Sequence, residues 1–518
     1  MKPIFAFLFS CSLAAVTALA ADLYVSKDKG SNKNAGTKDA PVKNIQKAID
    51  KAQDGDVIHI AQGLYFGTMD IGYIEIKKSV TLLGGYSPDF SSRDTVKYPV
   101  LIQPTNASNA TGAHKPALDI QTENLPNTPI VIDGLIFDKG ESNNYHGKDG
   151  KPEGVETGML LHPPMKGEQK YVTTDTPLIK GRANSDITIQ NCFFLNSPNY
   201  GIMLGNRKGK ILIKNNVFVG NAFAGVEIFG TSAKPHETKL ELAYNTILFN
   251  WSRTKDLSSF GYGTRIMTNM DYNIHHNIIG LSILSGIANT RIDKTKEIEV
   301  NDNLFFLNRE FDMSLPSQGG IFMKIKAADF EEIESLKSAS GNKEITDLAG
   351  LKDAINKEYL NGFLNVSYTE KTLLDPNSAA NMLRETMGLN KQGTINSKVT
   401  MYANKYPLQD AFKLVGAVSG YGAQSMSDSG STQPVAAPSA NESSQTTPPA
   451  EQPKQEPAPS MESNQTMNSQ VSEAKISEPA SQPTASEQGA SVMPSEANKT
   501  IDMPAQPEPA SNEANATR

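Results

Sequence analysis

Cysteine is almost absent from this sequence, which has two cysteines, one tryptophan and a formal net charge of only −7 over 518 residues. Cys11 lies in an apolar N-terminal stretch, so removal of that stretch would leave Cys192 alone and exclude any intrachain disulfide. There is no basic stripe and no interleaving of basic with aromatic residues, which argues against nucleic acid as a partner. These absences disfavour a disulfide-stapled scaffold and a nucleic-acid-binding domain.

Residues 1–20 have the composition of a cleaved secretory signal. One basic residue precedes an apolar run over residues 4–16, and Ala18-Leu19-Ala20 stands directly before Ala21. Cleavage is predicted near Ala20 and Ala21, so the mature protein is expected to be exported to the periplasm, the cell surface or the medium. An alternative interpretation treats residues 8–11 as a lipoprotein cleavage box, although the apolar core before Cys11 is then very short.

The other end of the chain lacks aromatic residues altogether. Residues 424–518 are dominated by Pro, Ser, Ala, Gln, Glu and Asn. Such a segment cannot bury enough apolar surface to offset the entropy of ordering, so we predict a disordered tail. A wall-spanning spacer, a partner-binding tail and a solvated extension without a specific role all fit this composition. No apolar stretch in the tail is long enough to span a membrane.

A short phrase returns along the middle of the chain: two apolar residues one spacer apart, two further spacers, a small polar residue, one spacer, then Phe or Ile. Its copies begin at Ile130, Ile187, Ile211, Leu240, Tyr272 and Ile298. The alternation inside each copy has the period of two that defines a β-strand. From Ile187 onward the copies begin 24, 29, 32 and 26 residues apart. This repetition predicts stacked units that bury their apolar faces against one another.

One column of the phrase is polar in most copies. It holds Leu135, Cys192, Asn216, Asn245, Asn277 and Asn303. Hydrogen-bonded strands lie about 4.8 Å apart, so these side chains are expected to stand above one another. An inward column of asparagines predicts a ladder of amide hydrogen bonds along the stack. Because Cys192 shares this column, we expect a buried small side chain there and not a reactive thiol.

A second strand is predicted after each phrase, marked by Gly and an alternating apolar pair. Its copies begin at Thr157, Tyr200, Ala224, Tyr262, Ser285 and Gly319. Coils with two or more strands, polar turns and no intervening helix suit a parallel β-solenoid. Residues 42–52 place Val42, Ile45, Ala48, Ile49 and Ala52 on one helical face, which predicts an N-terminal capping helix.

The helical spacing of residues 329–337 and 347–359 predicts a C-terminal cap over the last coil or a small appended subdomain. The expected organisation is therefore a signal over residues 1–20, a β-helix with its N-terminal cap over 21–325, a C-terminal cap or subdomain over 326–423, and the tail over 424–518.

The asparagine phrase and the stretches VIHIAQGLYFG from Val57 and VTLLGGYSPDFSSRD from Val80 resemble secreted bacterial β-helix proteins. The chain is similar to right-handed parallel β-helix repeat proteins of the pectin-lyase-like superfamily, over about residues 22–325. The resemblance implies an all-β fold. It also implies that any chemistry on acidic polysaccharides occurs on the outward face of one parallel sheet, in a groove walled by long loops.

The outward positions beside the Gly column are predicted to be Asp119, Leu160, Met203, Glu227, Arg265, Ala288 and Phe322. Asp119 and Glu227 lie several coils apart, which disfavours a calcium-dependent lyase because calcium needs six to eight oxygen ligands. The paired aspartates and Gly-His-Gly of polygalacturonases are also absent. Glu227 and Arg265 remain, on neighbouring coils. Arg265 could neutralise a substrate carboxylate while Glu227 or His162 moves a proton; the alternative is a cross-strand ion pair with a structural role.

Other polar and aromatic residues are weaker candidates. His275 and His276 point apart if they lie in a strand, so a turn or surface role is favoured over metal binding. Trp251 and Tyr262 could stack on sugar rings or serve as packing. The long excursion over residues 139–182 could wall a saccharide groove.

Two functions are compatible with these observations. The preferred one is an exported β-helix protein that binds glycan or a protein partner along its solenoid face. The alternative is a lyase or epimerase of acidic glycans that works without a calcium cluster. No cofactor or metal is expected, and no transmembrane segment is expected in the mature chain.

Overall fold

The computed structural model describes residues 20–68, 73–103, 115–138, 176–197, 199–251, 261–267, 269–289, 296–309, 311–316, 322–348, 350–367, 375–392 and 405–426. The chain divides into two units, residues 1–443 and 444–518, and all described residues belong to the first. The predicted signal over residues 1–19 and the tail from residue 427 onward lie outside the described residues. None of the helices in the described part is long and apolar enough to cross a membrane.

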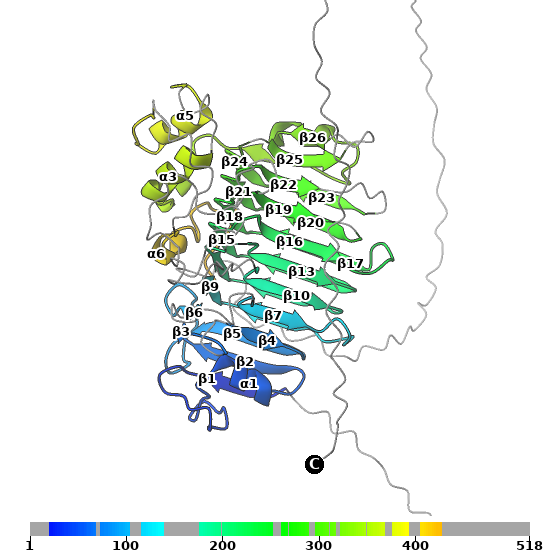
Figure 1. Cartoon of the computed structure of the whole chain (residues 1–518), viewed down its shortest axis with the longest axis vertical. Helices are drawn as coiled ribbons and strands as arrows, with labels where there is room; N and C mark the ends of the chain where they lie inside the picture. The colour runs from blue at the N-terminus through cyan, green and yellow to red at the C-terminus, as the bar shows by residue number, and fades with distance from the viewer. Residues whose placement is uncertain are drawn as a thin grey trace, which may run out of the picture. The chain divides into compact units, whose positions relative to one another are not determined.

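The described strands form three parallel sheets that wind around one core (Figure 1). Sheet A contains, in spatial order, β1 (Asp22–Val25), β2 (Asp56–Ala61), β5 (Val80–Tyr86), β8 (Ile130–Asp133), β11 (Ile187–Gln190), β14 (Gly209–Lys214), β17 (Thr238–Ala243), β20 (Asp271–His275) and β23 (Ile298–Asn301). The two alternating apolar residues that open the predicted phrase therefore lie in sheet A, whose strands pair in parallel from coil to coil, and the closing Phe or Ile lies in the next sheet.

Sheet B follows sheet A in every coil. It contains β3 (Gly63–Tyr65), β6 (Val100–Ile102), β9 (Ile136–Asp138), β12 (Phe193–Leu195), β15 (Val217–Val219), β18 (Thr246–Leu248), β21 (Ile278–Gly280), β24 (Leu304–Phe306) and β27 (Lys343–Glu344). β12, β15 and β24 consist of apolar residues, and both faces of these strands are buried.

Sheet C completes each coil. It contains β4 (Ile74–Ile76), β7 (Leu118–Gln121), β10 (Ile179–Ala183), β13 (Ile202–Asn206), β16 (Ala224–Gly230), β19 (Tyr262–Ile266), β22 (Ser285–Asn289), β25 (Phe311–Pro316) and β26 (Phe322–Ile325). Only β26 pairs antiparallel among the described strands of this sheet. The predicted all-β parallel β-helix is confirmed.

The asparagine ladder lies inside the turn between sheets A and B. Asn216, Asn245, Asn277 and Asn303 are fully buried, and each donates its side-chain amide to the next side-chain oxygen at 2.9–3.0 Å. Asn342 extends the ladder by one coil. At the other end, the Cys192 backbone N–H donates to Asn216, and burial raises the pKa of the thiol to about 12. Cys192 is thus a buried member of the column.

A left-handed residue before each ladder position makes this turn sharp. Asn191, Asn215, Tyr244, His276 and Asp302 have φ values between 53° and 60°. This region is unfavourable for most L-residues, so the stacked coils hold the backbone there. The side chains at these positions form an outer row along the turn, one residue per coil.

Both ends of the solenoid are covered. Helix α1 (Ile45–Lys51) buries Ile45, Ala48 and Ile49 in the core, and Asn44 caps its N-terminus by accepting from Gln46 N–H at 3.1 Å. The loop that precedes α1 hydrogen-bonds to the free edge of β1. At the last coil the 3₁₀ helix η2 (Ala327–Glu332) packs Phe330 on Phe305, with ring centroids 5.3 Å apart.

The helices after residue 347 have a different position from η2. Helices α2 (Leu351–Ala354), α3 (Lys357–Ser367), α5 (Ala379–Thr386) and α6 (Leu408–Phe412) lie along the side of the stack, over the outer face of sheet B (Figure 1). Leu348, Leu351 and Ile355 pack in one cluster with outward sheet B residues such as Val217 and Ile278. Of the predicted C-terminal cap, residues 327–339 cover the last coil, whereas the described residues between 347 and 423 cover sheet B.

Residues 405–426, the C-terminal strap, fasten this cover to the turn. Two asparagines bind its backbone reciprocally: Asn196 bonds to Tyr406 at 2.7 and 3.1 Å, and Asn215 bonds to Gln424 at 2.6 and 3.0 Å. Gln424 therefore belongs to the packed part of the chain and not to the tail that was predicted to begin there.

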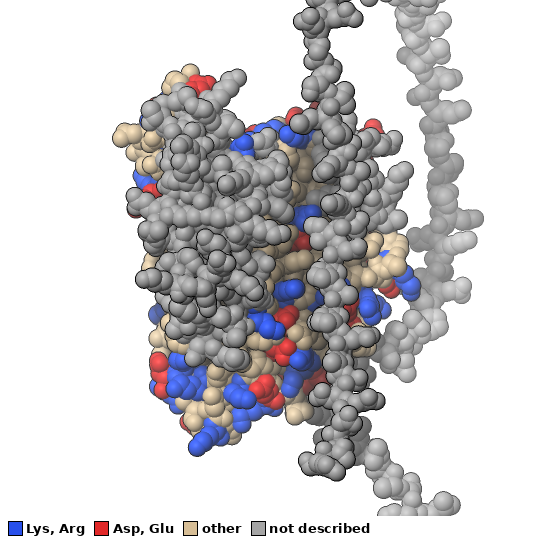
Figure 2. Space-filling model, in the orientation of Figure 1, with Lys and Arg blue, Asp and Glu red and all other residues tan. Residues whose placement is uncertain are grey.

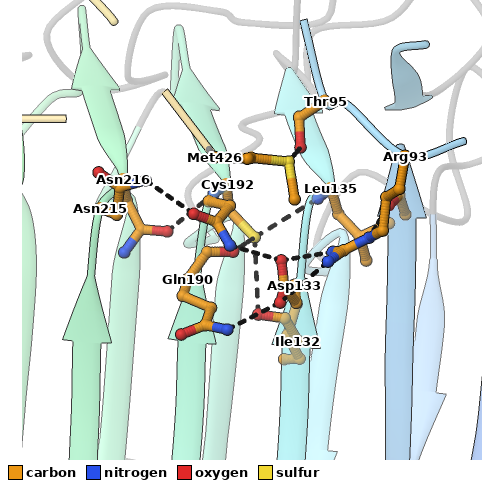
Figure 3. A network of polar contacts seen from close by, with 12 residues as sticks. Arg93, Thr95, Ile132, Asp133, Leu135, Gln190, Cys192, Asn215, Asn216 and Met426 are labelled. Atoms are coloured by element: carbon orange, nitrogen blue, oxygen red, sulfur yellow. Dashed lines mark hydrogen bonds and ion pairs between the residues drawn. The ribbon is translucent and has the colours of Figure 1, made fainter. Parts of the chain in front are cut away.

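Figure 3 shows the polar network beneath the strap. Asp133 is buried and pairs with Arg93 from the loop after β5. Asp133 also accepts from Gln190 and Asn191, both at 2.7 Å, and Asn191 accepts from Asn215 at 2.7 Å. The network therefore links the first coils to the C-terminal strap through fully partnered polar groups.

Candidate functional site

Glu227 of β16 and Arg265 of β19 face outward from sheet C, opposite each other in register, as predicted. Arg265 Nη1 lies 2.8 Å from Glu227 Oε2. The same guanidinium nitrogen lies 3.4 Å from the phenolic oxygen of Tyr200, which precedes β13. The structure therefore brings the two predicted residues together and adds Tyr200. His162 lies outside the described residues.

Glu227 and Arg265 differ in how deeply they are buried. Glu227 is only 3% exposed, whereas the Arg265 side chain is 24% exposed. Burial alone would lower the pKa of Arg265, but the Glu227 carboxylate and the Tyr200 phenol raise it above its ordinary value. Burial, followed by the charge of Glu227, raises the pKa of Tyr200. Glu227 therefore keeps a permanently charged guanidinium in place, and Arg265 is the member that reaches solvent.

One nitrogen of Arg265 has no partner. Its Nε is buried and makes no hydrogen bond, although Nη1 is fully engaged by Glu227 and Tyr200. An unsatisfied buried donor costs about 1–3 kcal/mol. The side chain is therefore held through Nη1, while part of it remains exposed on the outer face of sheet C.

Two positions of the predicted outward column differ from the structure. Lys180 of β10 lies between Asp119 and Met203, the place predicted for Leu160. β10 pairs with both β7 and β13 and so occupies the position between them. The sequence IKGRA has its glycine three positions later than the other copies, since Gly181 pairs with Leu204 and not with Gly201, which is why the pattern missed it. Residue 160 itself lies outside the described residues.

The second difference is at the last coil. Ser314 of β25 follows Ala288 in the column, where Phe322 was predicted. Phe322 begins β26, which pairs antiparallel with β25 and so turns back along the sheet. The Gly-Gly pair at positions 319 and 320 was interpreted as another coil because its apolar alternation resembles the earlier copies.

Cationic side chains accompany this column on the neighbouring coils. Lys180, Arg182 and Arg207 are exposed, and the two arginines share one carboxylate, Glu123, at 3.7 and 3.5 Å. The Arg182 guanidinium also lies 5.8 Å from the ring centroid of Phe229. Figure 2 shows basic and acidic side chains interspersed over the coils from β4 to β10. Lys180, Arg182 and Arg207 outnumber the neighbouring carboxylates Asp119 and Glu123, which gives this part of the face a local positive excess.

The remaining candidates have structural surroundings. Trp251 is 3% exposed and donates its indole N–H to Gly220 O at 2.8 Å, so it is packing. His275 ends β20 and His276 lies in the following turn, with their Nδ1 atoms 3.1 Å apart. Among the described residues no group of three or more His, Cys, Asp or Glu side chains is arranged to hold a metal ion. The two histidines therefore lie at the junction of β20 with the following turn.

Comparison with known proteins gives a partial match at the N-terminal end. The family described as a protein of unknown function, DUF1565, matches residues 28–92, which include α1 and β2 to β5. A pectate lyase of Emericella nidulans, PEL9, is 47% identical over 68 residues, or 13% of this chain and 16% of that protein. The chain thus matches only about a sixth of the length of this relative. The chain is a parallel β-helix, and its N-terminal coils are similar to part of a pectate lyase.

Solved structures similar to this β-helix are remote in sequence. A rhamnogalacturonan lyase is 12% identical, with 57% of this chain and 70% of that chain covered and a TM-score of 0.33. A GH136 lacto-N-biosidase from Eubacterium ramulus is 11% identical, with 57% of each chain covered and a TM-score of 0.29.

Proposed function

We propose that this protein is an exported β-helix that binds an acidic polysaccharide along the outer face of sheet C. The observation that carries the proposal is a set of cations from β10 to β19: Lys180, Arg182 and Arg207 are exposed, and Arg265 is partly exposed. Successive strands lie about 4.8 Å apart, a spacing comparable to the length of one sugar residue. Carboxylates along a polysaccharide could therefore meet guanidinium groups on successive coils.

Arg265 is the central group of the proposed site. Glu227 and Tyr200 fix one side of its guanidinium, so little side-chain entropy is lost when an anion binds to the other side. Arg182 lies beside Phe229, whose ring could contact the apolar face of a sugar. Binding through exposed charges should weaken with added salt, because ions screen interactions over about 8 Å at physiological ionic strength.

The test compares two ligands that differ in charge. Polygalacturonate and its fully methyl-esterified form are titrated into the mature protein by isothermal calorimetry. We expect measurable affinity for polygalacturonate, about fivefold weaker binding of Arg182→Gln, and little binding of the esterified polymer. Lys239→Gln removes one exposed charge from sheet A and is the matched control. Equal affinity for the two polymers, or equal weakening by Lys239→Gln, would contradict the proposal.

The role of Arg265 in binding is tested with a variant that preserves the fold. Removing one member of a buried ion pair costs about 3–5 kcal/mol, whereas replacing both members with apolar residues is often nearly neutral. The double variant Glu227→Leu/Arg265→Met should therefore retain the thermal transition of the wild type and lose affinity for polygalacturonate. Unchanged affinity in this folded variant would exclude Arg265 from the binding site.

A lyase or epimerase of acidic glycans is the second candidate, favoured by the 47% identity to a pectate lyase over 68 residues. In that reaction Arg265 would neutralise the substrate carboxylate while a base removes the adjacent carbon-bound proton. Glu227 is too buried to serve as that base; the other predicted group, His162, lies outside the described residues. Accumulation of unsaturated or epimerised product from polyuronates, lost in the double variant, would establish catalysis.

A further inference from the structure

The N-terminal edge of sheet A contains a buried carboxylate that has no cation. Asp56, the first residue of β2, is 5% exposed. Its Oδ2 accepts from Gln53 N–H at 2.7 Å and its Oδ1 accepts from Ala21 N–H at 2.8 Å. No Lys, Arg or His side chain of the described residues forms an ion pair with it. A buried carboxylate that is satisfied only by neutral donors lacks the charge partner that such groups usually have.

The donor on Oδ1 belongs to the residue that follows the predicted cleavage motif. Small residues at positions 18 and 20 direct cleavage to the bond between Ala20 and Ala21. Both residues are exposed, so a peptidase can reach this bond. Hydrolysis consumes one water molecule, leaves a carboxylate on Ala20 and converts the Ala21 amide nitrogen into a primary ammonium.

We infer that cleavage between Ala20 and Ala21 creates an ion pair between the new N-terminal ammonium and Asp56, which locks β1 onto β2. Ala21 is already held in register, because its carbonyl accepts from Val57 N–H at 3.0 Å. The nitrogen therefore needs no movement to reach Asp56. Its α-amino pKa of about 7.7–8.0 keeps most of the group charged at neutral pH. An ion pair then replaces a hydrogen bond from an uncharged donor.

This inference shares only the exported location with the proposed function and does not depend on what sheet C binds. The site of cleavage then decides whether the ion pair forms. A chain that keeps Ala20, or that loses Ala21, has no N-terminal ammonium at Asp56. The exposed end of the first strand, β1, would then be held only by hydrogen bonds from uncharged donors.

The test has two parts, neither of which uses a glycan. First, the intact mass of the protein recovered after export should correspond to a chain that begins at Ala21; another N-terminus would overturn the assigned cleavage. Second, hydrogen exchange is measured on the peptide that contains Val57, in chains that begin at Ala21 or at Ala20. We expect exchange about fivefold slower in the chain that begins at Ala21. The peptide that contains β20 is the internal control.

Two further chains separate charge from hydrogen bonding. Acetylation of the Ala21 amine removes the charge and keeps one N–H donor, so it should restore the faster exchange of the Ala20 chain. In the Asp56→Asn background the choice of N-terminus should make no difference. Equal exchange for the free, acetylated and extended chains in the wild-type background would overturn the ion pair, whether or not Asp56→Asn folds.

Discussion

At the scale of single residues, the ladder asparagines support the fold by satisfying backbone groups that the tight turn leaves unpaired. Asn245 accepts from both the backbone and the side-chain N–H groups of Asn216 at 3.0 Å. It donates to the carbonyl of Ile213 at 2.9 Å and to the Asn277 side chain at 2.9 Å. Each asparagine thus connects three successive coils.

Asn245→Ala should therefore be strongly destabilising. The substitution leaves buried donors on Asn216 and a buried carbonyl on Ile213 without partners, at about 1–3 kcal/mol each. We expect a loss of about 2–4 kcal/mol in the free energy of unfolding, measured by chemical denaturation. Asn273→Ala, on the outer face of the next strand, is the matched control and should change stability by less than about 0.5 kcal/mol. Comparable losses for the two variants would contradict the ladder's role.

Single residues also show where sequence-based prediction succeeds and where it fails. The Asn216 column was predictable because its residue type and its place in the phrase are both constant. A second set of polar contacts between coils was missed because its residue types vary and no phrase marks it: Ser197 bonds to Asn221, and Ser282 bonds to Asn250 and Asn308. Likewise, strand register predicted the neighbours Glu227 and Arg265, but burial of Glu227 depends on loops and on Tyr200, which no local pattern specifies.

At the scale of elements, the C-terminal strap packs against the outer row of turn residues at the end of β20. His276 stacks between Tyr244 and Tyr421, with ring centroids 4.9 and 5.8 Å apart, and its carbonyl accepts from Gly422 N–H at 2.8 Å. Burial, and then the neighbouring charge of His275, lower the pKa of His276, while Asp302 opposes the shift. The packed strap therefore favours the neutral imidazole.

This direction fixes the sign of a pH dependence. A histidine whose pKa is lower in the folded state contributes stability above its unfolded pKa of about 6.5, and that contribution is lost as pH falls through the folded value. Acidification from pH 8 to pH 5 should loosen the strap. Hydrogen exchange of residues 405–426, corrected for intrinsic rates, should be faster at pH 5.

The matched variant is His276→Tyr. Tyrosine already occupies the equivalent left-handed position at Tyr244, with φ of 55° in both cases, so the backbone accepts it. This variant should abolish the pH dependence of exchange in the strap, whereas His59→Tyr on β2 should leave it unchanged. A pH dependence that persists in His276→Tyr would assign the effect to another group.

At the scale of the whole molecule, the arrangement of coils followed from the repeat, but the C-terminal cover did not. The repeat predicts which faces point inward, because the strand period of two is regular. Sheet B departs from this alternation: strands such as Val217–Val219 and Leu304–Phe306 are apolar throughout, a sign that both faces are buried. That signal was present in the sequence, whereas the identity of the covering segment depends on contacts across more than 200 residues, such as Asn196 with Tyr406.

The cover should therefore be indispensable for solubility, and the tail should not. A chain that ends at Glu344 exposes the outward apolar side chains of sheet B, among them Phe193, Val217 and Ile278, which otherwise pack against the C-terminal helices. A large exposed apolar face on parallel strands promotes association. We expect this chain to bind a hydrophobic dye and to elute as aggregates in size-exclusion chromatography.

The control for this truncation is a chain that ends at Met426, which keeps the strap and its bonds to Asn196 and Asn215. It should elute as the full chain does, after allowance for length, and should have the same thermal transition, since residues 427–518 have no aromatic side chain to contribute to a core. A soluble, dye-free chain ending at Glu344 would show that sheet B tolerates solvent. In that case, the hydrogen bonds between the strap and the turn would have a role other than fixing the C-terminal helices over sheet B.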